Sequence, residues 1–384
     1  MLNKFSPLHR RFASLASCGL LLAGTACQKE QLVSPAPQES VTSLLNGSAK
    51  HEFKEPVTTR DGKHLKFAGR EDFERVMRDI EKLQPGESIE AHLAKWEKAH
   101  NFYSLRADKA KKAKAKYDAS GGGSQTMAAQ SQSSSAGMVA ENEAPTEDMV
   151  IGPYETPATE QDFIADDYLA AVLSPDQTIQ IGETVYRLDG TTNNIFYISS
   201  DNTQLYDELI AETPTSPDVR FYPMDQNVFE LQEAGIEGAS ATSNFVLPIG
   251  SGIGCGPNAD RRKSEGGVNY SSNQRLDCKV VYQSVGIYFS IIAKAQNQKR
   301  FLGIWWSQQA GVYLLPNPGA QWEELCRGYS NSNFNGYSNI GGYGDGNTVA
   351  KRYYESTRGL KNYNVSVSFR VGQAQAGPFR IEYR

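Results

Sequence analysis

The end of the chain carries a two-residue alternation that constrains the fold more than any other feature of the sequence. From Tyr363 to Gly372, apolar or aromatic residues alternate with polar residues or glycine without interruption. A period of two is typical of a strand with one buried face. The alternation returns from Phe379 to Tyr383, after a segment at 373–377 that we expect to be a loop. The sequence therefore predicts a hairpin at the C-terminus.

A two-stranded hairpin is only marginally stable in water, so its apolar face has to pack on further strands. The preceding part of the chain supplies strand-like segments, at 279–283, 286–293, 300–306 and 311–315. Short connections without a helical pattern separate them. This arrangement favours a mainly antiparallel β domain, either a sandwich or a partly rolled sheet.

The first residues have the form of an export signal. Lys and Arg residues precede an apolar stretch at 12–23, which is too short to span a membrane as a helix. Two cysteines compete for the cleavage site. The residues before Cys18 fit a bacterial lipobox better by type, but cleavage at Cys27 leaves a full-length apolar segment and a polar mature start. We predict a lipoprotein signal peptide at 1–26 and lipidation of Cys27, with ordinary secretion as the alternative.

A lipidated Cys27 predicts a location at the outer membrane or cell surface, and a periplasm-facing anchor is the alternative. The segment 27–50 is polar and contains prolines, which is typical of a flexible tether. The predicted partner is thus the membrane, through the lipid anchor. Lys29-Glu30, just after the cysteine, resembles the charged surface-export signal of Bacteroidota lipoproteins.

Residues 51–118 predict a helical unit. Apolar residues spaced by three and four indicate a helix over 70–83, which Pro85-Gly86 ends. A second helix from Ser88 should fold back on the first as a helical hairpin. Its lysine-rich continuation at 107–117 is interpreted as a solvated extension, with a polyanion-binding arm as the alternative.

Composition then changes sharply. Residues 119–150 are rich in Ser, Gly, Gln and Ala, which predicts a disordered linker and the main domain boundary. The remaining 151–384 form the predicted β domain, and the fold class is α+β. Its start should be a helix capped by Thr159 and Asp162.

The pattern after that helix predicts a hairpin around Gly182-Glu183. A third strand is expected at 195–198 and a short helix near 204–210, while 211–278 is interpreted mostly as loops.

Several short motifs resemble a widespread group of uncharacterised Bacteroidota lipoproteins. They are listed here in chain order: Leu65-Lys66-Phe67, the helix containing Phe73, Trp96-Glu97, Phe102, Ser104-Leu105, Ile179 to Tyr186, and Phe301 to Trp305. The resemblance implies a lipid-anchored protein with an N-terminal helical unit and a C-terminal β unit. It implies no activity and no catalytic residue. The lysine-rich stretch after Leu105 and the three mature cysteines depart from the pattern.

Charge is distributed unevenly along the chain. Residues 141–260 hold 22 acidic and 2 basic residues, a net charge of −20, whereas 261–384 hold 7 acidic and 16 basic residues, a net charge of +9. We expect the two segments to pack or steer toward each other, and a cationic surface for an anionic glycan is the alternative. The basic residues are scattered among strands, so no nucleic-acid partner is predicted.

Catalytic candidates are few, because no histidine follows residue 100. The five are His9, His51, His64, His92 and His100. A Ser-His-Asp or Cys-His site confined to the C-terminal part is therefore excluded, as is a histidine-ligated zinc. His92 and His100 are expected to be solvated. Paired carboxylates, as in glycoside hydrolysis, remain open with Asp166, Asp167, Glu323 and Glu324 as candidates. No catalytic residue, metal or cofactor is assigned.

Three cysteines remain in the mature chain after Cys27. In an oxidising compartment, Cys255, Cys278 and Cys326 allow one disulfide and one free thiol, with the pairing left open. The neighbours Trp305 and Trp306 must face opposite sides of a strand. Both sides are rich in apolar residues, so core packing is expected for both tryptophans.

The segment 329–347 sets aromatic rings among Asn, Ser and Gly, a composition typical of adaptable binding surfaces. The candidate binding residues are Tyr329, Phe334, Tyr337 and Tyr343. A flexible surface loop is the alternative.

These features predict a lipid-anchored binding or structural module, with a glycan or a surface protein as ligand. The alternative is a carboxylate-dependent glycoside hydrolase or another glycan-processing enzyme.

Overall fold

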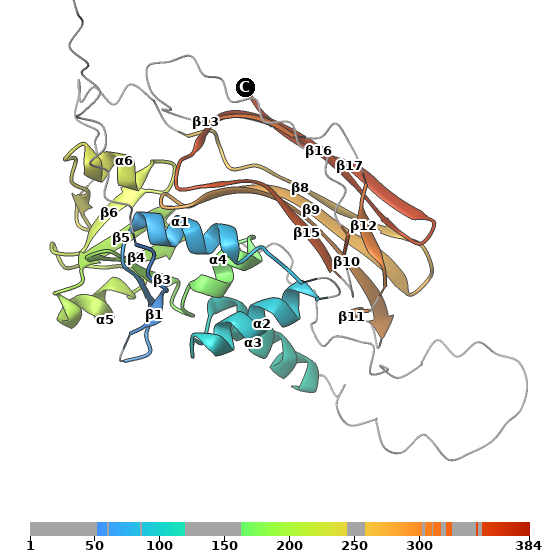
Figure 1. Ribbon diagram of the computed structural model, residues 1–384, viewed down its shortest axis with the longest axis horizontal. Helices are drawn as coiled ribbons and strands as arrows, with labels where there is room; N and C mark the ends of the chain where they lie inside the picture. The colour runs from blue at the N-terminus through green and yellow to red at the C-terminus, as the bar shows by residue number, and fades with distance from the viewer. Residues whose placement is uncertain are drawn as a thin grey trace, which may run out of the picture. The chain divides into compact units, whose positions relative to one another are not determined.

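Antiparallel strands make up most of the fold, arranged as one sheet with helices packed on it and two further five-stranded sheets (Figure 1). The computed structural model describes residues 52–59, 61–84, 87–119, 163–243, 258–301, 304–308, 310–315, 320–324, 343–344 and 348–384. Phe53–Arg384 form one compact unit. The predicted α+β class with a mainly antiparallel β domain is confirmed.

The first sheet has seven strands in chain order. They are β1 (Val57–Thr58), β2 (Leu65–Phe67), β3 (Thr178–Ile181), β4 (Thr184–Asp189), β5 (Asn194–Ser199), β6 (Arg220–Pro223) and β7 (Ala239–Ser240). The hairpin β3–β4 turns at Gly182, whose φ of +61° suits glycine, as the sequence predicted. The predicted strand at 195–198 is confirmed as β5.

One pairing in this sheet is parallel, and it joins distant parts of the chain. Lys66 of β2 pairs with Gln180 of β3. The predicted linker at 119–150 begins at Ala119, which is the last residue of α3, and its remainder lies outside the described residues. Strands on its two sides, β2 and β3, are neighbours in this sheet. The strands β1 and β2, which precede the helices, therefore belong to the same sheet as the first strands of the β region.

The helices that follow β2 are α1 (Arg70–Asp79), α2 (Ile89–Ala99) and α3 (Leu105–Ala119). Ser88 caps α2 by accepting a hydrogen bond from the Ala91 amide at 3.1 Å. The lysine-rich stretch does not continue α2, because the backbone of Asn101 takes a φ of +48° and breaks the helix. Ser104 then accepts from the Ala107 amide at 3.0 Å and starts the separate helix α3.

The shorter helices are α4 (Asp167–Val172), the 3-10 turn η1 (Thr203–Leu205), α5 (Tyr206–Leu209) and α6 (Val228–Glu233). The predicted capping residues Thr159 and Asp162 lie outside the described residues, and α4 begins only at Asp167. Asp166 caps α4, because its Oδ1 accepts from the amides of Tyr168 at 3.0 Å and Leu169 at 3.3 Å.

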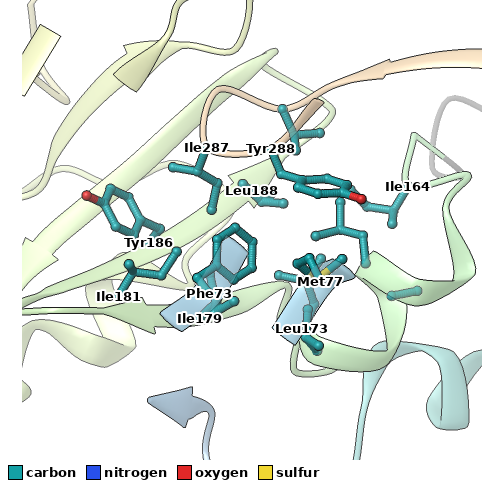
Figure 2. Close-up of a cluster of buried hydrophobic side chains, with 14 of the residues drawn as sticks. Phe73, Met77, Ile164, Leu173, Ile179, Ile181, Tyr186, Leu188, Ile287 and Tyr288 are labelled. Carbon is teal, nitrogen blue, oxygen red and sulfur yellow. The ribbon is translucent and has the colours of Figure 1, made fainter. Parts of the chain in front are cut away.

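A hydrophobic core lies between the first sheet and the helices. Figure 2 shows Phe73 and Met77 of α1 beside Ile179 of β3 and Leu188 of β4, with Tyr288, which directly precedes β10, in the same cluster. Both α1 and α2 also pack on β15. The helical segment thus shares its core with strands from both ends of the β region.

The other two sheets face each other as a sandwich. One contains β8 (Lys263–Asn269), β9 (Gln274–Ser284), β10 (Phe289–Phe301), β11 (Ile304–Ser307) and β15 (Thr348–Ser356). The other contains β12 (Val312–Leu314), β13 (Ala320–Glu324), β14 (Tyr343–Gly344), β16 (Leu360–Val371) and β17 (Ala374–Tyr383). Inner residues of both sheets form a single cluster, which includes Val280, Phe289, Val365 and Phe369.

The C-terminal hairpin is confirmed as β16 and β17, with a tighter turn than expected. The turn is Gly372-Gln373, where Gly372 has a φ of +54°, and most of the predicted loop at 373–377 is already strand. Gly377 lies at a register shift with a φ of +111°, and a Cβ there would approach the Val367 carbonyl oxygen to 2.8 Å. A bulge replaces the expected loop.

The interpretation of 211–278 as mostly loops was wrong, because β6, α6, β7, β8 and the start of β9 lie there. β8 explains the error, since it is a mostly exposed edge strand of sequence KSEGGVN without a regular apolar alternation. No helix in the described part of the chain is long and apolar enough to cross a membrane.

Candidate functional site

A row of polar side chains runs along the outer face of the β9–β10–β11 sheet. Antiparallel registry places Arg275, Gln298 and Ser307 side by side, and the next row holds Asp277, Gln296 and Thr348. Directly opposed residues of antiparallel strands share a face of the sheet. Their neighbours Leu276 and Cys278 lie in the sandwich core.

Hydrogen bonds link this row across three strands. Arg275 Nε donates to Gln298 Oε1 at 2.6 Å, Gln298 Nε2 donates to Gln296 Oε1 at 3.0 Å, and Gln296 Nε2 donates to Thr348 Oγ1 at 3.3 Å. Gln298 has no exposed surface and Gln296 is 6% exposed, so this chain satisfies amides that would be costly to bury alone. The chain also fixes the direction of the Arg275 side chain.

Trp305 lies on the same face as this row, where it pairs with Arg300. It is half-buried, and the guanidinium carbons of Arg275 and Arg300 lie 4.5 Å and 6.0 Å from its ring centroid. Cations over an indole face are held by the ring quadrupole. The expectation of core packing is therefore wrong for Trp305, which lies on the arginine-bearing outer face. The side chain of Trp306 lies outside the described set.

We call Arg275, Gln296, Gln298, Arg300 and Trp305 the Trp305 face. It combines an aromatic ring, two guanidinium groups and two amides, of which Arg300 is exposed and the amides are buried. Rings of this kind stack on the apolar faces of flat ligands, while amides and guanidinium groups donate to hydroxyl or anionic oxygens. Because the amides are buried, the ring and the guanidinium groups are the parts of this face that a ligand can contact.

The described residues of the predicted aromatic loop, 343–344, belong to the other five-stranded sheet. Tyr329, Phe334 and Tyr337 lie outside the described residues, but residue 343 pairs with Tyr313 in the β14–β12 ladder. Three residues separate Gly344 from Thr348, so these two positions are at most about 14 Å apart. Thr348 belongs to the hydrogen-bonded row. Gly344 is thus close along the chain to this row, but neither Gly344 nor Thr348 is part of the Trp305 face.

The four candidate catalytic carboxylates have other partners. Asp166 is fully buried and accepts from the Ser290 hydroxyl at 2.8 Å through Oδ2, and Asp167 forms an ion pair with Lys294. Glu323 binds Lys361 at 3.1 Å and Asn362 at 2.6 Å, and Glu324 opposes Leu360 in the β13–β16 ladder. Helix capping and strand pairing account for these positions.

A second cluster of charged groups is buried where α1, α4 and β15 meet. Arg352 is 4% exposed, and its guanidinium lies 2.9 Å from Glu355 and 3.4 Å from Glu81, with its Nη1 donating to the Tyr288 hydroxyl at 2.7 Å. Burial raises the pKa of Asp166 and raises the pKa of Glu355 to about 7, although Arg352 opposes both shifts. Sequence spacing could not have found this cluster, since its members come from distant segments.

The histidines also have structural partners. His92 lies 2.9 Å from Glu87 and 2.9 Å from the Ile80 carbonyl oxygen, and the His100 Nδ1 lies 2.8 Å from the Trp96 carbonyl oxygen. Both are half-buried, which differs from the expected solvated state. Within the described residues, no group of three or more His, Cys, Asp or Glu side chains is arranged to hold a metal ion.

Of the three mature cysteines, only Cys278 falls in a described segment. It is a free thiol at 2% exposure in the sandwich core, and burial raises its pKa well above the usual range. Cys255 and Cys326 lie outside the described residues, as does Cys27.

Ion pairs link the acidic and basic segments. Arg358 Nε lies 3.0 Å from Glu230, and Lys294 pairs with Asp167. These contacts agree with the expectation that the two segments pack against each other.

Comparison with known proteins adds little. No family model matches the sequence, and no curated protein matches it. A similar solved structure is that of a DUF4848 family protein from Bacteroides thetaiotaomicron, at 13% sequence identity and a TM-score of 0.20, covering 83% of this chain and 94% of that chain. A similarity this weak supports no conclusion about function.

Proposed function

We propose that this protein is a lipid-anchored binding protein of the outer membrane or cell surface, and that its ligand is a glycan held on the Trp305 face. The observation that carries the proposal is a half-buried Trp305 on an outer sheet face, flanked by Arg275 and Arg300. The anchor rests on the signal peptide at 1–26 and on Cys27.

The chemistry of the face fits a sugar. A pyranose ring presents apolar C–H groups on one side, which stack on an indole, and hydroxyl groups at its edge, which accept hydrogen bonds from guanidinium groups. The buried chain through Gln298 and Gln296 holds Arg275 in place before a ligand arrives. Preorganisation of this kind lowers the entropic cost of binding.

The test is binding of the full-length protein to a glycan array. We expect Trp305→Ala to lower affinity about tenfold or more, because removing a stacked aromatic ring costs on the order of 1–3 kcal/mol. Trp305→Tyr should retain most of the affinity. The double change Tyr337→Ala and Tyr343→Ala should weaken binding if the aromatic loop contributes to the same site.

Tyr103→Ala is the matched control. Tyr103 is 46% exposed and also lies under a cation, with Lys111 Nζ 5.8 Å from its ring centroid, but it precedes α3. Thermal unfolding identifies any variant that is merely unstable. Binding unchanged in a folded Trp305→Ala protein, or reduced equally by Tyr103→Ala, would remove the Trp305 face from the proposal.

A further inference from the structure

We infer that the glycan bound by the Trp305 face is a polysaccharide whose sugars carry an anionic group, a carboxylate or a sulfate. This inference rests on the proposed function and specifies its ligand class. It starts from the two guanidinium groups at one indole ring, which give the face more positive charge than a neutral sugar requires.

Arg300 is the exposed member of this pair. Within the described part of the chain, its side chain contacts the Trp305 ring, and no ion pair of 4.0 Å or less with a described carboxylate is found. Its backbone amide donates to the Asn273 carbonyl oxygen at 2.6 Å, which fixes the position of the residue at the end of β10. The hydrogen bond positions the main chain, and the exposed guanidinium beside the indole can receive an anion from solvent.

Arg275 adds a second, more buried charge. Its Nε donates to the neutral amide oxygen of Gln298, and its guanidinium lies closer to the Trp305 ring than that of Arg300 does, at 4.5 Å against 6.0 Å. The nearest acidic residue in the adjacent row is Asp277. Burial raises the pKa of Asp277, and the charge of Arg275 opposes this shift.

Geometry also favours an anion on a ring. A guanidinium presents two parallel N–H groups that match a carboxylate or sulfate, and such charge-assisted pairs are about twice as strong as neutral hydrogen bonds. In a uronic acid or a sulfated sugar, the anionic group projects from the edge of the ring. A sugar packed against the part of the Trp305 ring that Arg275 does not cover would direct that group toward the two guanidinium groups.

The experiment compares three polymers with the full-length protein at about 0.1 M salt. They are polygalacturonate, a sulfated glycosaminoglycan and a neutral glucan. We expect one of the two anionic polymers to bind about tenfold more tightly than the neutral one, which also identifies the anionic group. Arg300→Gln should remove this preference, and Arg300→Lys should retain part of it.

Arg380→Gln is the matched control, since it removes the same charge from the outer strand β17, where Arg380 Nε donates to Asn364 Oδ1 at 3.2 Å. It should change affinity less than twofold. Equal binding of neutral and anionic polymers, or an equal loss in Arg300→Gln and Arg380→Gln, would overturn the inference while leaving the proposed function intact. Failure to bind any glycan would overturn both.

Discussion

The buried Arg352 interacts with acidic groups from several segments of the chain. Its guanidinium interacts electrostatically with carboxylates on three segments: Glu81 after α1, Asp166 before α4, and Glu355 on its own strand. Burial alone would lower the pKa of Arg352, but Tyr288 and these carboxylates more than offset that effect and raise it. Burial raises the pKa of Glu355, and Arg352, which is shared among three acids, offsets that effect only in part.

Glu355 therefore makes folding stability depend on pH. Because its pKa is raised to about 7 in the folded state, from 4.5, the folded protein binds the proton more tightly than the unfolded chain. This contribution is fully present below about pH 4.5 and is lost as pH rises toward 7.

Chemical unfolding of the wild type and of Glu355→Gln between pH 5 and 8 tests this point. The wild-type advantage should fall with rising pH, by on the order of 2 kcal/mol, and then level off. An advantage that grows with pH would show that Glu355 is stabilised as the anion. Glu382→Gln, on an outer strand and ion-paired with Arg380, is a control that should show no such trend.

The outer face of strand β9 is polar in the first half of the strand and buried in the second half. In its first half Leu276, Cys278 and Val280 face the sandwich core, while Arg275 and Asp277 lie on the outer face. In its second half both faces are buried, because Val281 packs against Ala165 and Ile292. A strand with a polar outer side at one end and a covered one at the other is suited to carry a binding face beside a rigid core.

The position of Cys278 on β9 gives a prediction about the disulfide. A free thiol in the sandwich core leaves Cys255 and Cys326 as the pair available for oxidation. Thiol titration of the denatured mature protein should find one thiol, and peptide mapping should identify it as Cys278.

In the native protein this thiol should not react, since its burial keeps it protonated and inaccessible. Cys278→Ala should therefore leave the disulfide in place. A mapped disulfide that contains Cys278, or three reactive thiols after denaturation, would contradict the assignment.

At the scale of the whole molecule, the proposed anchor and the proposed binding face belong to different parts of the chain. Cys27 precedes the compact unit that begins at Phe53, so the intervening residues would join the lipid to the folded part. We expect mass spectrometry of the mature protein to find a diacylated Cys27 followed by Gln28-Lys29.

Cell fractionation extends this test. Cys27→Ser should move the protein from the membrane fraction to a soluble one, whereas Cys18→Ser should leave it membrane-bound. A mature N-terminus that starts at Cys18 would move the anchor to that residue, and one without lipid would contradict the proposed anchor itself.

The parts of the fold that the sequence determined by itself are those with local causes. The alternation from Tyr363 to Val371 specified β16, because a one-sided strand needs only a period of two. Gly182 specified the β3–β4 turn through its positive φ, and the spacing of Phe73, Val76 and Met77 specified α1. In each case neighbouring residues carry the whole signal.

Tertiary structure alone decided which distant segments meet. The parallel pairing of Lys66 with Gln180, the acids around Arg352 and the arginines beside Trp305 all depend on registry between strands far apart in the chain. Spacing along the sequence does not encode that registry. Trp305 shows the physical reason: its apolar neighbours in the sequence suggested a core, but the strands paired across the sheet put guanidinium groups and amides on its side.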